Sequence, residues 1–118
     1  MKNDNRTIDW NASVQEAMER ITDNQRGAVI VVDDSFCLQG VVSDGDIRRA
    51  MLRGATLFTP VAKILNPNAV SITEPEAASG RAQEIFQKES SINILPVVNE
   101  NNQVVAVAIR NPGQRKTL

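Results

Sequence analysis

The stretch Gly40-Val-Val-Ser-Asp-Gly-Asp-Ile-Arg-Arg49 decides how this 118-residue chain is interpreted. An apolar run that begins at Leu38 ends at Ser43, and a helix-compatible segment over 44–53 follows and is closed by Gly54. A strand, a tight turn and the start of a helix therefore meet within a few residues. The unpaired N–H groups and the positive dipole end of a helix N-terminus favour a polar, anionic ligand there.

Ser43 and Asp46 stand three residues apart at the mouth of this helix, and two interpretations of the pair stay open. In the first, the Asp46 carboxylate accepts hydrogen bonds from a ribose diol and Ser43 supplies a third contact. In the second, the same spacing forms a Ser-x-x-acid capping arrangement that satisfies the helix and nothing else.

Composition narrows the classes of protein that this chain can belong to. The formal net charge is −1, and there is no basic field of the kind that nucleic acid requires. No apolar run approaches membrane-spanning length, and the beginning of the chain is polar rather than signal-like. The single cysteine, Cys37, forms no internal disulfide. We therefore expect a cytoplasmic domain that contacts neither nucleic acid nor membrane.

Missing residue types argue against catalysis. Histidine and tyrosine are absent, so His-based triads, His general bases and the usual zinc sites are excluded. No Gly-rich phosphate loop occurs, and no nucleophile is paired with a base. Acid–base chemistry would fall to carboxylates alone, and we expect neither a metal nor catalytic residues.

The same order of elements occurs twice along the chain. The first copy predicts an extended piece over 7–10, a helix from residue 13, strands over 28–32 and 38–42, and a helix over 44–53. In its first helix we expect one inward face of apolar residues: Val14, Ala17, Met18 and Ile21. A connection with a short helix over 61–65 follows. The second copy predicts an extended piece over 70–72, a helix over 73–88, and strands over 93–98 and 104–109.

An offset of 66 residues relates the two copies. It superposes Val31-Val32-Asp33 on Val97-Val98-Asn99 and places Gly40 on Ala106. Each copy has only about 50 residues, too few to bury much core alone, so the copies should pack as one unit. The second copy lacks a counterpart of the last helix, because Asn111-Pro112-Gly113 breaks any continuation.

With this repeat, the chain resembles a tandem pair of cystathionine-β-synthase (CBS) domains, a Bateman module. The motifs that carry the resemblance are Ala28-Val-Ile-Val-Val-Asp33, Ile94-Leu-Pro-Val-Val-Asn99, the stretch Leu38 to Arg49, and the connection 60–68. The resemblance implies an α+β fold (an α/β sandwich) of two βαββα-type repeats. It implies repeats over 7–58 and 59–110, packed sheet to sheet with pseudo-twofold symmetry, and a linker over 111–118 towards another domain.

The resemblance also implies a ligand, an adenosyl nucleotide such as AMP, ADP or ATP. In this family the Ser/Thr-x-x-Asp motif of one repeat holds the ribose, and segments of the other repeat enclose the base. The residues carried over are Ser43, Asp44 and Asp46 for the ribose, Arg48 or Arg49 for a phosphate, and Ala69, Val70, Ile92, Asn93 and Ile94 around the base. The second motif is degraded, because Ile109 and Pro112 stand where Ser43 and Asp46 would recur.

Two functions follow as expectations. The first is a regulatory module that binds a nucleotide and controls an attached catalytic domain; the resemblance to pairs fused to sugar-1-phosphate nucleotidyltransferases or attached to sugar-phosphate isomerases favours a nucleotidyltransferase. The second is a ligand-free module that serves structure or dimerisation. In either case we expect a homodimer, because the apolar arcs of the helices over 44–53 and 73–88 are wider than one buried face needs: Ile47, Ala50, Met51 and Leu52 in one, and Ala77, Ala78, Ala82, Ile85 and Phe86 in the other.

Overall fold

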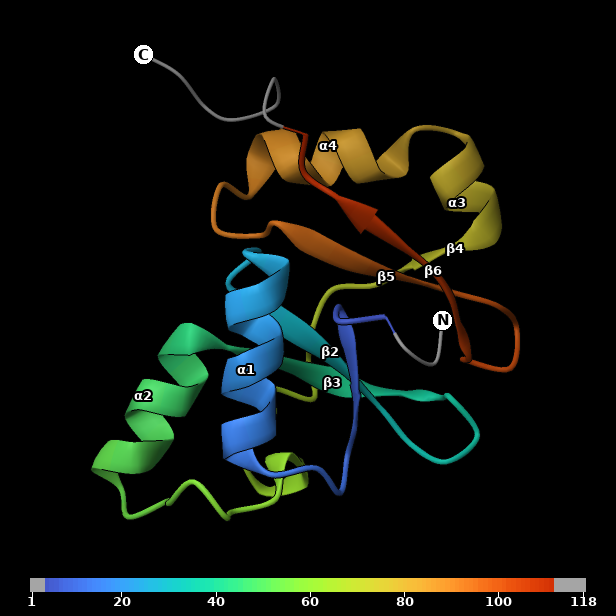
Figure 1. Cartoon of the computed structure of the whole chain (residues 1–118). Coiled ribbons are helices and arrows are strands. Elements are labelled where there is room, and N and C mark those ends of the chain that lie inside the picture. Colours follow the sequence, from blue (N-terminus) through green and yellow to red (C-terminus); the bar gives the residue numbers. More distant parts are fainter. Residues whose placement is uncertain (1–3, 112–118) are drawn as a thin grey trace.

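The computed structural model describes residues 4–111, which form two three-stranded sheets (Figure 1). The first half runs β1 (Thr7–Asp9), α1 (Val14–Asn24), β2 (Ala28–Val32), β3 (Leu38–Ser43) and α2 (Asp44–Leu52). A connection with the 3₁₀ helix η1 (Val61–Lys63) leads to β4 (Ile72–Thr73), α3 (Glu74–Ala78), α4 (Arg81–Lys88), β5 (Ile94–Val98) and β6 (Val104–Ile109). The predicted α+β fold of two packed repeats is confirmed.

The two sheets have the same topology and the same register. In each, the central strand pairs in parallel with the short first strand and antiparallel with the last strand. Val31 pairs with Gly40, and Val97 pairs with Ala106, so the offset of 66 residues holds pair by pair. Each ladder also shifts register one residue later, before Val32 and Val98.

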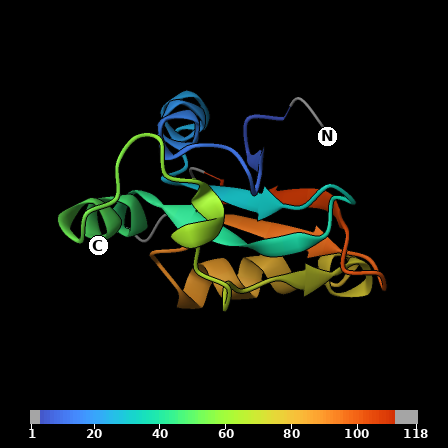
Figure 2. The ribbon, with the colours of Figure 1, turned by 90° about the horizontal axis from the view of Figure 1, so that it is seen from below.

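The sheets stack face to face, with α1 on the outside of one and α3 and α4 on the outside of the other (Figure 2). Alternation along the central strands explains this layering, because successive side chains of a strand point to opposite faces. Val29 and Val31 pack in the core under α1, while Ile30 and Val32 belong to the core between the sheets. The second sheet contributes Ile94, Val98 and Val104 to that inter-sheet core. Both central strands are therefore buried on two faces, as their continuous apolar runs predict.

Two symmetry-related hydrogen bonds join the hairpin turns of the two halves. Leu38 N donates to Asn102 O, and Val104 N donates to Phe36 O, both at 2.9 Å. Each donor and each acceptor maps onto its counterpart by the offset of 66 residues. Phe36 and Asn102 also share a left-handed backbone, with φ of 64° and 61°. These bonds express the pseudo-twofold relation directly.

Gly40 marks the one place where the connection crosses the first sheet. A Cβ atom on Gly40 would lie 2.4 Å from the backbone oxygen of Asn66, which is too close for any side chain. Val41 and Asn66 exchange two backbone hydrogen bonds at this crossing. At the equivalent position of the second sheet, Ala106 is exposed, so its methyl group is accommodated.

Several local predictions need correction. The helix predicted over 73–88 is broken at Ser79 and Gly80, because Gly80 adopts a left-handed backbone (φ 87°) and starts α4 in a new direction. Met18 is 39% exposed rather than part of the inward face of α1. The predicted helix over 61–65 is a single 3₁₀ turn. The predicted linker 111–118, and the predicted lack of a final helix, lie outside the described residues except for Asn111.

Candidate functional site

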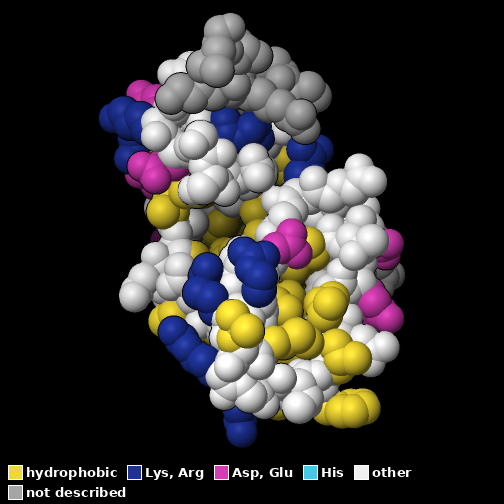
Figure 3. Space-filling model, turned by 90° about the vertical axis from the view of Figure 1, so that its left-hand side faces the viewer, with side chains coloured by type: hydrophobic (Ala, Val, Ile, Leu, Met, Phe, Trp, Pro, Cys, Tyr) yellow, Lys and Arg dark blue, Asp and Glu magenta, His cyan; other side chains and the backbone are white. Residues whose placement is uncertain are grey.

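A pocket of about 380 Å³ opens between the two halves of the molecule. We call it the inter-repeat pocket. It is formed where β3 passes into α2, where the chain enters β2 and β5, and where the connection approaches β4. Figure 3 shows a hollow with an apolar floor on this face, bordered by basic side chains. The lining residues are Arg26, Gly27, Ala28, Val41, Ser43, Asp46, Arg49, Asn66, Asn68, Ala69, Val70, Ser91, Ile92, Asn93 and Ile94.

Ser43 and Asp46 form a complete capping box at the mouth of α2. Ser43 Oγ accepts a hydrogen bond from the Asp46 backbone N–H at 3.1 Å, and Asp46 Oδ2 accepts one from the Ser43 N–H at 2.9 Å. Asp46 Oδ1 also accepts a hydrogen bond from Arg49 Nη2 at 3.0 Å. The capping interpretation is therefore realised in the structure, and both side chains still line the pocket. The two interpretations describe the same residues and do not exclude each other.

Most of the predicted site residues come together in this pocket. Those that line it are Ser43, Asp46, Ala69, Val70, Ile92, Asn93 and Ile94. Asp44 and Arg48 do not line it, and helix geometry gives the reason. Each stands two residues from Asp46, about 200° around an α-helix, so each projects from the opposite side of α2. Arg49, three residues from Asp46, shares its face and lines the pocket instead.

The sequence interpretation missed Arg26, Gly27 and Ala28. The repeat offset could have found them, because they stand 66 residues before Ile92, Asn93 and Ile94, which were predicted. The pocket therefore takes the same short segment from both repeats, just before each central strand begins. Arg26 and Arg49 are its two cations, and Asp46 is the one carboxylate among its lining residues.

Arg110 closes the corresponding place in the second repeat. Its backbone N–H donates to Asn93 O at 2.9 Å, as the Asp44 N–H donates to Gly27 O at 3.0 Å. The Arg110 side chain turns inward, is only 5% exposed, and its guanidinium carbon lies 5.1 Å from the ring centre of Phe86. Ile109 pairs with Ile94 in the register in which Ser43 pairs with Ala28, so an apolar residue replaces the serine as predicted. Pro112 lies outside the described residues.

Two searches over the described residues, 4–111, add negative findings. No helix in that range is long and apolar enough to cross a bilayer. No three side chains among its Cys, Asp and Glu residues gather in a way that could hold a metal ion.

Comparison with solved structures identifies the fold. A CBS domain pair/ACT domain protein from Thermotoga maritima superposes with a TM-score of 0.71 at 23% identity, covering 87% of this chain and 79% of that one. A CBS domain protein from Pyrobaculum aerophilum, solved in complex with AMP, superposes with a TM-score of 0.67 at 22% identity, covering 87% and 78%. The CBS domain pair of protein MJ0100, in complex with 5′-methylthioadenosine and S-adenosyl-L-methionine, gives 0.67 at 22% identity, covering 87% and 79%.

Sequence comparison agrees with the fold. Residues 1–53 match the CBS domain family. The chain thus has the fold of a CBS domain pair, with its first repeat matched in sequence as well.

Curated relatives with longer chains give a further similarity. Arabinose 5-phosphate isomerase GutQ from Salmonella typhi is 34% identical over 92 residues, which are 78% of this chain and 28% of that protein. GutQ from Escherichia coli strain K12 is 36% identical over 93 residues. The chain therefore spans less than a third of the length of these relatives. They are sugar-phosphate isomerases, so the comparisons do not support the nucleotidyltransferase that the sequence favoured.

Proposed function

We propose that this chain is a regulatory module that binds one adenosyl nucleotide in the inter-repeat pocket and passes its occupancy to an attached catalytic domain. The observation that carries the proposal is the pocket itself. It joins the Ser43–Asp46 pair of one repeat to the Ile92–Ile94 segment of the other. A ligand that touches both favours one arrangement of the two repeats, and this differential affinity is what a regulatory ligand requires.

The chemistry of the lining suits each part of such a ligand. Backbone groups and the aliphatic side chains of Ala69, Val70 and Ile92 form an apolar surface for a purine. Asp46 offers a carboxylate for the ribose diol. Its oxygens already accept two printed hydrogen bonds, but a carboxylate has about four acceptor positions, so capacity remains for hydroxyl donors. Arg26 and Arg49 supply positive charge for a phosphate.

Related structures support this choice of ligand. The Pyrobaculum aerophilum protein was solved with AMP, and the MJ0100 domain pair with 5′-methylthioadenosine and S-adenosyl-L-methionine. Each of these ligands contains an adenosyl group, so we assign the same chemical class to the inter-repeat pocket.

The attached domain is proposed from the longer relatives. Because the matched relatives are arabinose 5-phosphate isomerases, we propose a sugar-phosphate isomerase rather than a nucleotidyltransferase as the regulated enzyme. Such an enzyme handles soluble phosphorylated sugars, which fits the cytoplasmic location expected from the sequence.

One observation favours the alternative, a ligand-free module that serves structure alone. The Ser43–Asp46 capping box is complete, and Asp46 is also paired with Arg49 without any ligand. In that function the motif stabilises α2, and the pocket has no occupant of its own.

Calorimetry on ligand-free protein separates the two functions. AMP, ADP, ATP and S-adenosyl-L-methionine are each titrated into the chain, with GTP as a control for the adenine. We expect heat and saturation for at least one adenosyl compound and none for GTP. Absence of binding for all four adenosyl compounds would reject the regulatory function and leave the structural one.

A further inference from the structure

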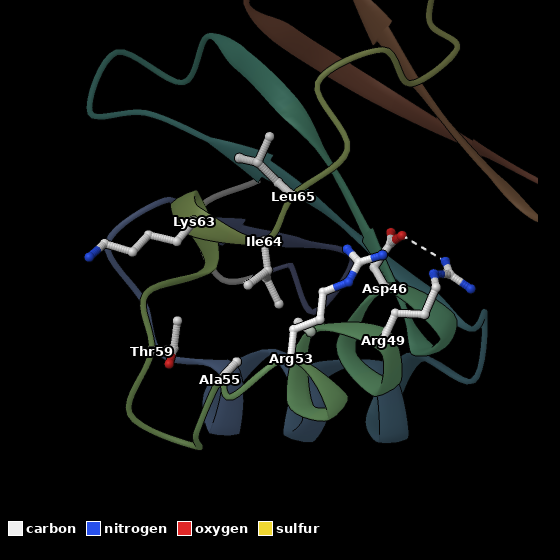
Figure 4. A pocket seen from close by; sticks show the side chains of 9 residues that line it. Asp46, Arg49, Arg53, Ala55, Thr59, Lys63, Ile64 and Leu65 are labelled. Carbon is white, nitrogen blue, oxygen red and sulfur yellow. Dashed lines mark hydrogen bonds and ion pairs between the residues drawn. The ribbon is translucent and has the colours of Figure 1, made fainter.

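A second pocket, of about 450 Å³, lies between α2 and the connection that follows it. We call it the α2–connection pocket. Its floor is apolar and includes Ala50, Ile64 and Leu65, while its polar groups come from both sides. Figure 4 shows Arg53 extending across the pocket towards Asp46, with Lys63 on the far side. The full lining is Asp46, Arg49, Ala50, Arg53, Ala55, Thr59, Lys63, Ile64 and Leu65.

Positive charge dominates this pocket. Arg49, Arg53 and Lys63 face one carboxylate, Asp46, which is already paired with Arg49. Within residues 4–111, neither Arg53 nor Lys63 takes part in an ion pair. Two cations at the rim of a concave, partly apolar surface are therefore available to an anion. Charge-assisted hydrogen bonds from arginine and lysine to phosphate oxygens are among the stronger polar contacts in proteins.

The α2–connection pocket adjoins the inter-repeat pocket. The two share Asp46 and Arg49, so the ion pair between these side chains forms the ridge that separates them. A ligand held at Asp46 by its ribose can cross this ridge beside the Arg49 guanidinium. Whatever part of it continues then meets Arg53 and Lys63. The part that fits is a chain of phosphoryl groups.

We propose that the α2–connection pocket binds the terminal phosphoryl groups of a nucleoside di- or triphosphate through Arg53 and Lys63. The proposal rests on the proposed function, since the nucleoside part occupies the inter-repeat pocket. It makes the length of the phosphate chain the feature that this module distinguishes. A monophosphate ends at the ridge near Arg26 and Arg49, whereas a triphosphate reaches the two further cations.

The test compares ATP with AMP in wild-type protein and in Arg53→Gln and Lys63→Gln. In the wild type we expect ATP to bind about tenfold or more tightly than AMP, the scale of one or two charge-assisted hydrogen bonds. Each variant should bring the ATP affinity down towards that of AMP, with the AMP affinity within about twofold of the wild type. Raising the salt concentration should reduce the advantage of ATP, because exposed cations are screened.

Matched controls are available in the second repeat. Arg81→Gln and Lys88→Gln remove the same charges from exposed positions on α4, away from both pockets. ATP affinity should be unchanged in both, and melting curves should show that all four variants fold. Equal affinities of AMP and ATP in the wild type, or an ATP advantage that survives Arg53→Gln and Lys63→Gln, would overturn the proposal while leaving the proposed function intact. If neither nucleotide binds, the proposed function fails and the phosphate site with it.

Discussion

The guanidinium of Arg110 is anchored to the backbone of Ile92: Nη2 and Nε donate to the Ile92 carbonyl oxygen at 2.7 Å and 3.1 Å. Nε also reaches Asn93 Oδ1 at 3.1 Å, and Nη2 donates to Glu89 O at 2.7 Å. Ile92 and Asn93 line the inter-repeat pocket. In addition, Arg26, another lining residue, donates to Arg110 O at 3.0 Å. The last residue after β6 therefore holds one wall of the pocket in place.

Replacing Arg110 by methionine should destabilise the fold and loosen that wall. The substitution keeps an apolar stem over Phe86 but leaves the carbonyl oxygens of Glu89 and Ile92 without their donors. We expect a loss of about 3 kcal/mol in the free energy of unfolding, the scale for charged hydrogen bonds at a buried site. Urea unfolding measures the loss, and calorimetry should show weaker nucleotide binding in the folded variant.

Arg81→Gln is the matched control for Arg110→Met. Arg81 forms an exposed ion pair with Glu84, so its loss should cost at most about 1 kcal/mol and leave binding unchanged. Similar stabilities of Arg110→Met and the wild type would show that the buried guanidinium is not needed to hold the pocket wall.

Asp46 should be required for binding far more than for stability. Asp46→Ala removes the carboxylate from the pocket and one half of the α2 capping box. We expect nucleotide binding to be lost, while the free energy of unfolding falls by only about 1 kcal/mol, the value of a helix cap. Calorimetry and urea unfolding measure the two effects on the same protein.

The second repeat offers a control that changes the cap without changing the pocket. Thr73 and Glu76 form the same capping box at the start of α3, with Glu76 Oε1 accepting from the Thr73 N–H at 2.8 Å. Neither residue lines the inter-repeat pocket. Glu76→Ala should therefore cost similar stability and leave binding intact. Unchanged binding in Asp46→Ala would mean that Asp46 acts only as a cap.

The sequence predicted the sheets well because their strands are buried on both faces. Such strands give continuous β-branched runs, and the repeat offset then fixes the register of one sheet from the other. The offset also carried information that the prediction did not use. It relates Arg26 to Ile92, and both line the pocket.

Other features depended on tertiary packing and were not predictable in the same way. Glycine inside a helix costs about 1 kcal/mol and does not always break it, so the change of direction at Gly80 had no clear signal. Arginine is rarely buried, which is why Arg110 was assigned no role. The choice between Arg48 and Arg49 followed only once Asp46 was known to face the pocket.

The chain should bind one nucleotide, not two. In the second repeat Ile109 takes the place of Ser43, and the buried Arg110 side chain is bonded to Ile92 and Asn93 on that side. An isoleucine offers no hydrogen bond to a ribose. Titration of ligand-free protein should saturate near one nucleotide per chain; two equivalent sites would show that the second repeat retains a functional ribose site.

The final prediction is that the chain forms a homodimer through the surface that includes α2. Leu52, at the end of α2, and Phe58, in the connection, are each 83% exposed, and Leu57 between them is 40% exposed. Figure 3 shows hydrophobic side chains gathered over this part of the molecule beside the basic ones. Side chains of this size gain about 1.5–3 kcal/mol each when fully buried, and a twofold axis would bury every one of them twice. Light scattering on the 118-residue chain at several concentrations measures the mass. Leu52→Gln and Phe58→Gln should shift the chain towards the monomer, whereas Val105→Gln, which changes an exposed apolar residue on β6, should not. A mass that stays at one chain near about 100 µM, a weak affinity for a specific interface, would contradict the dimer.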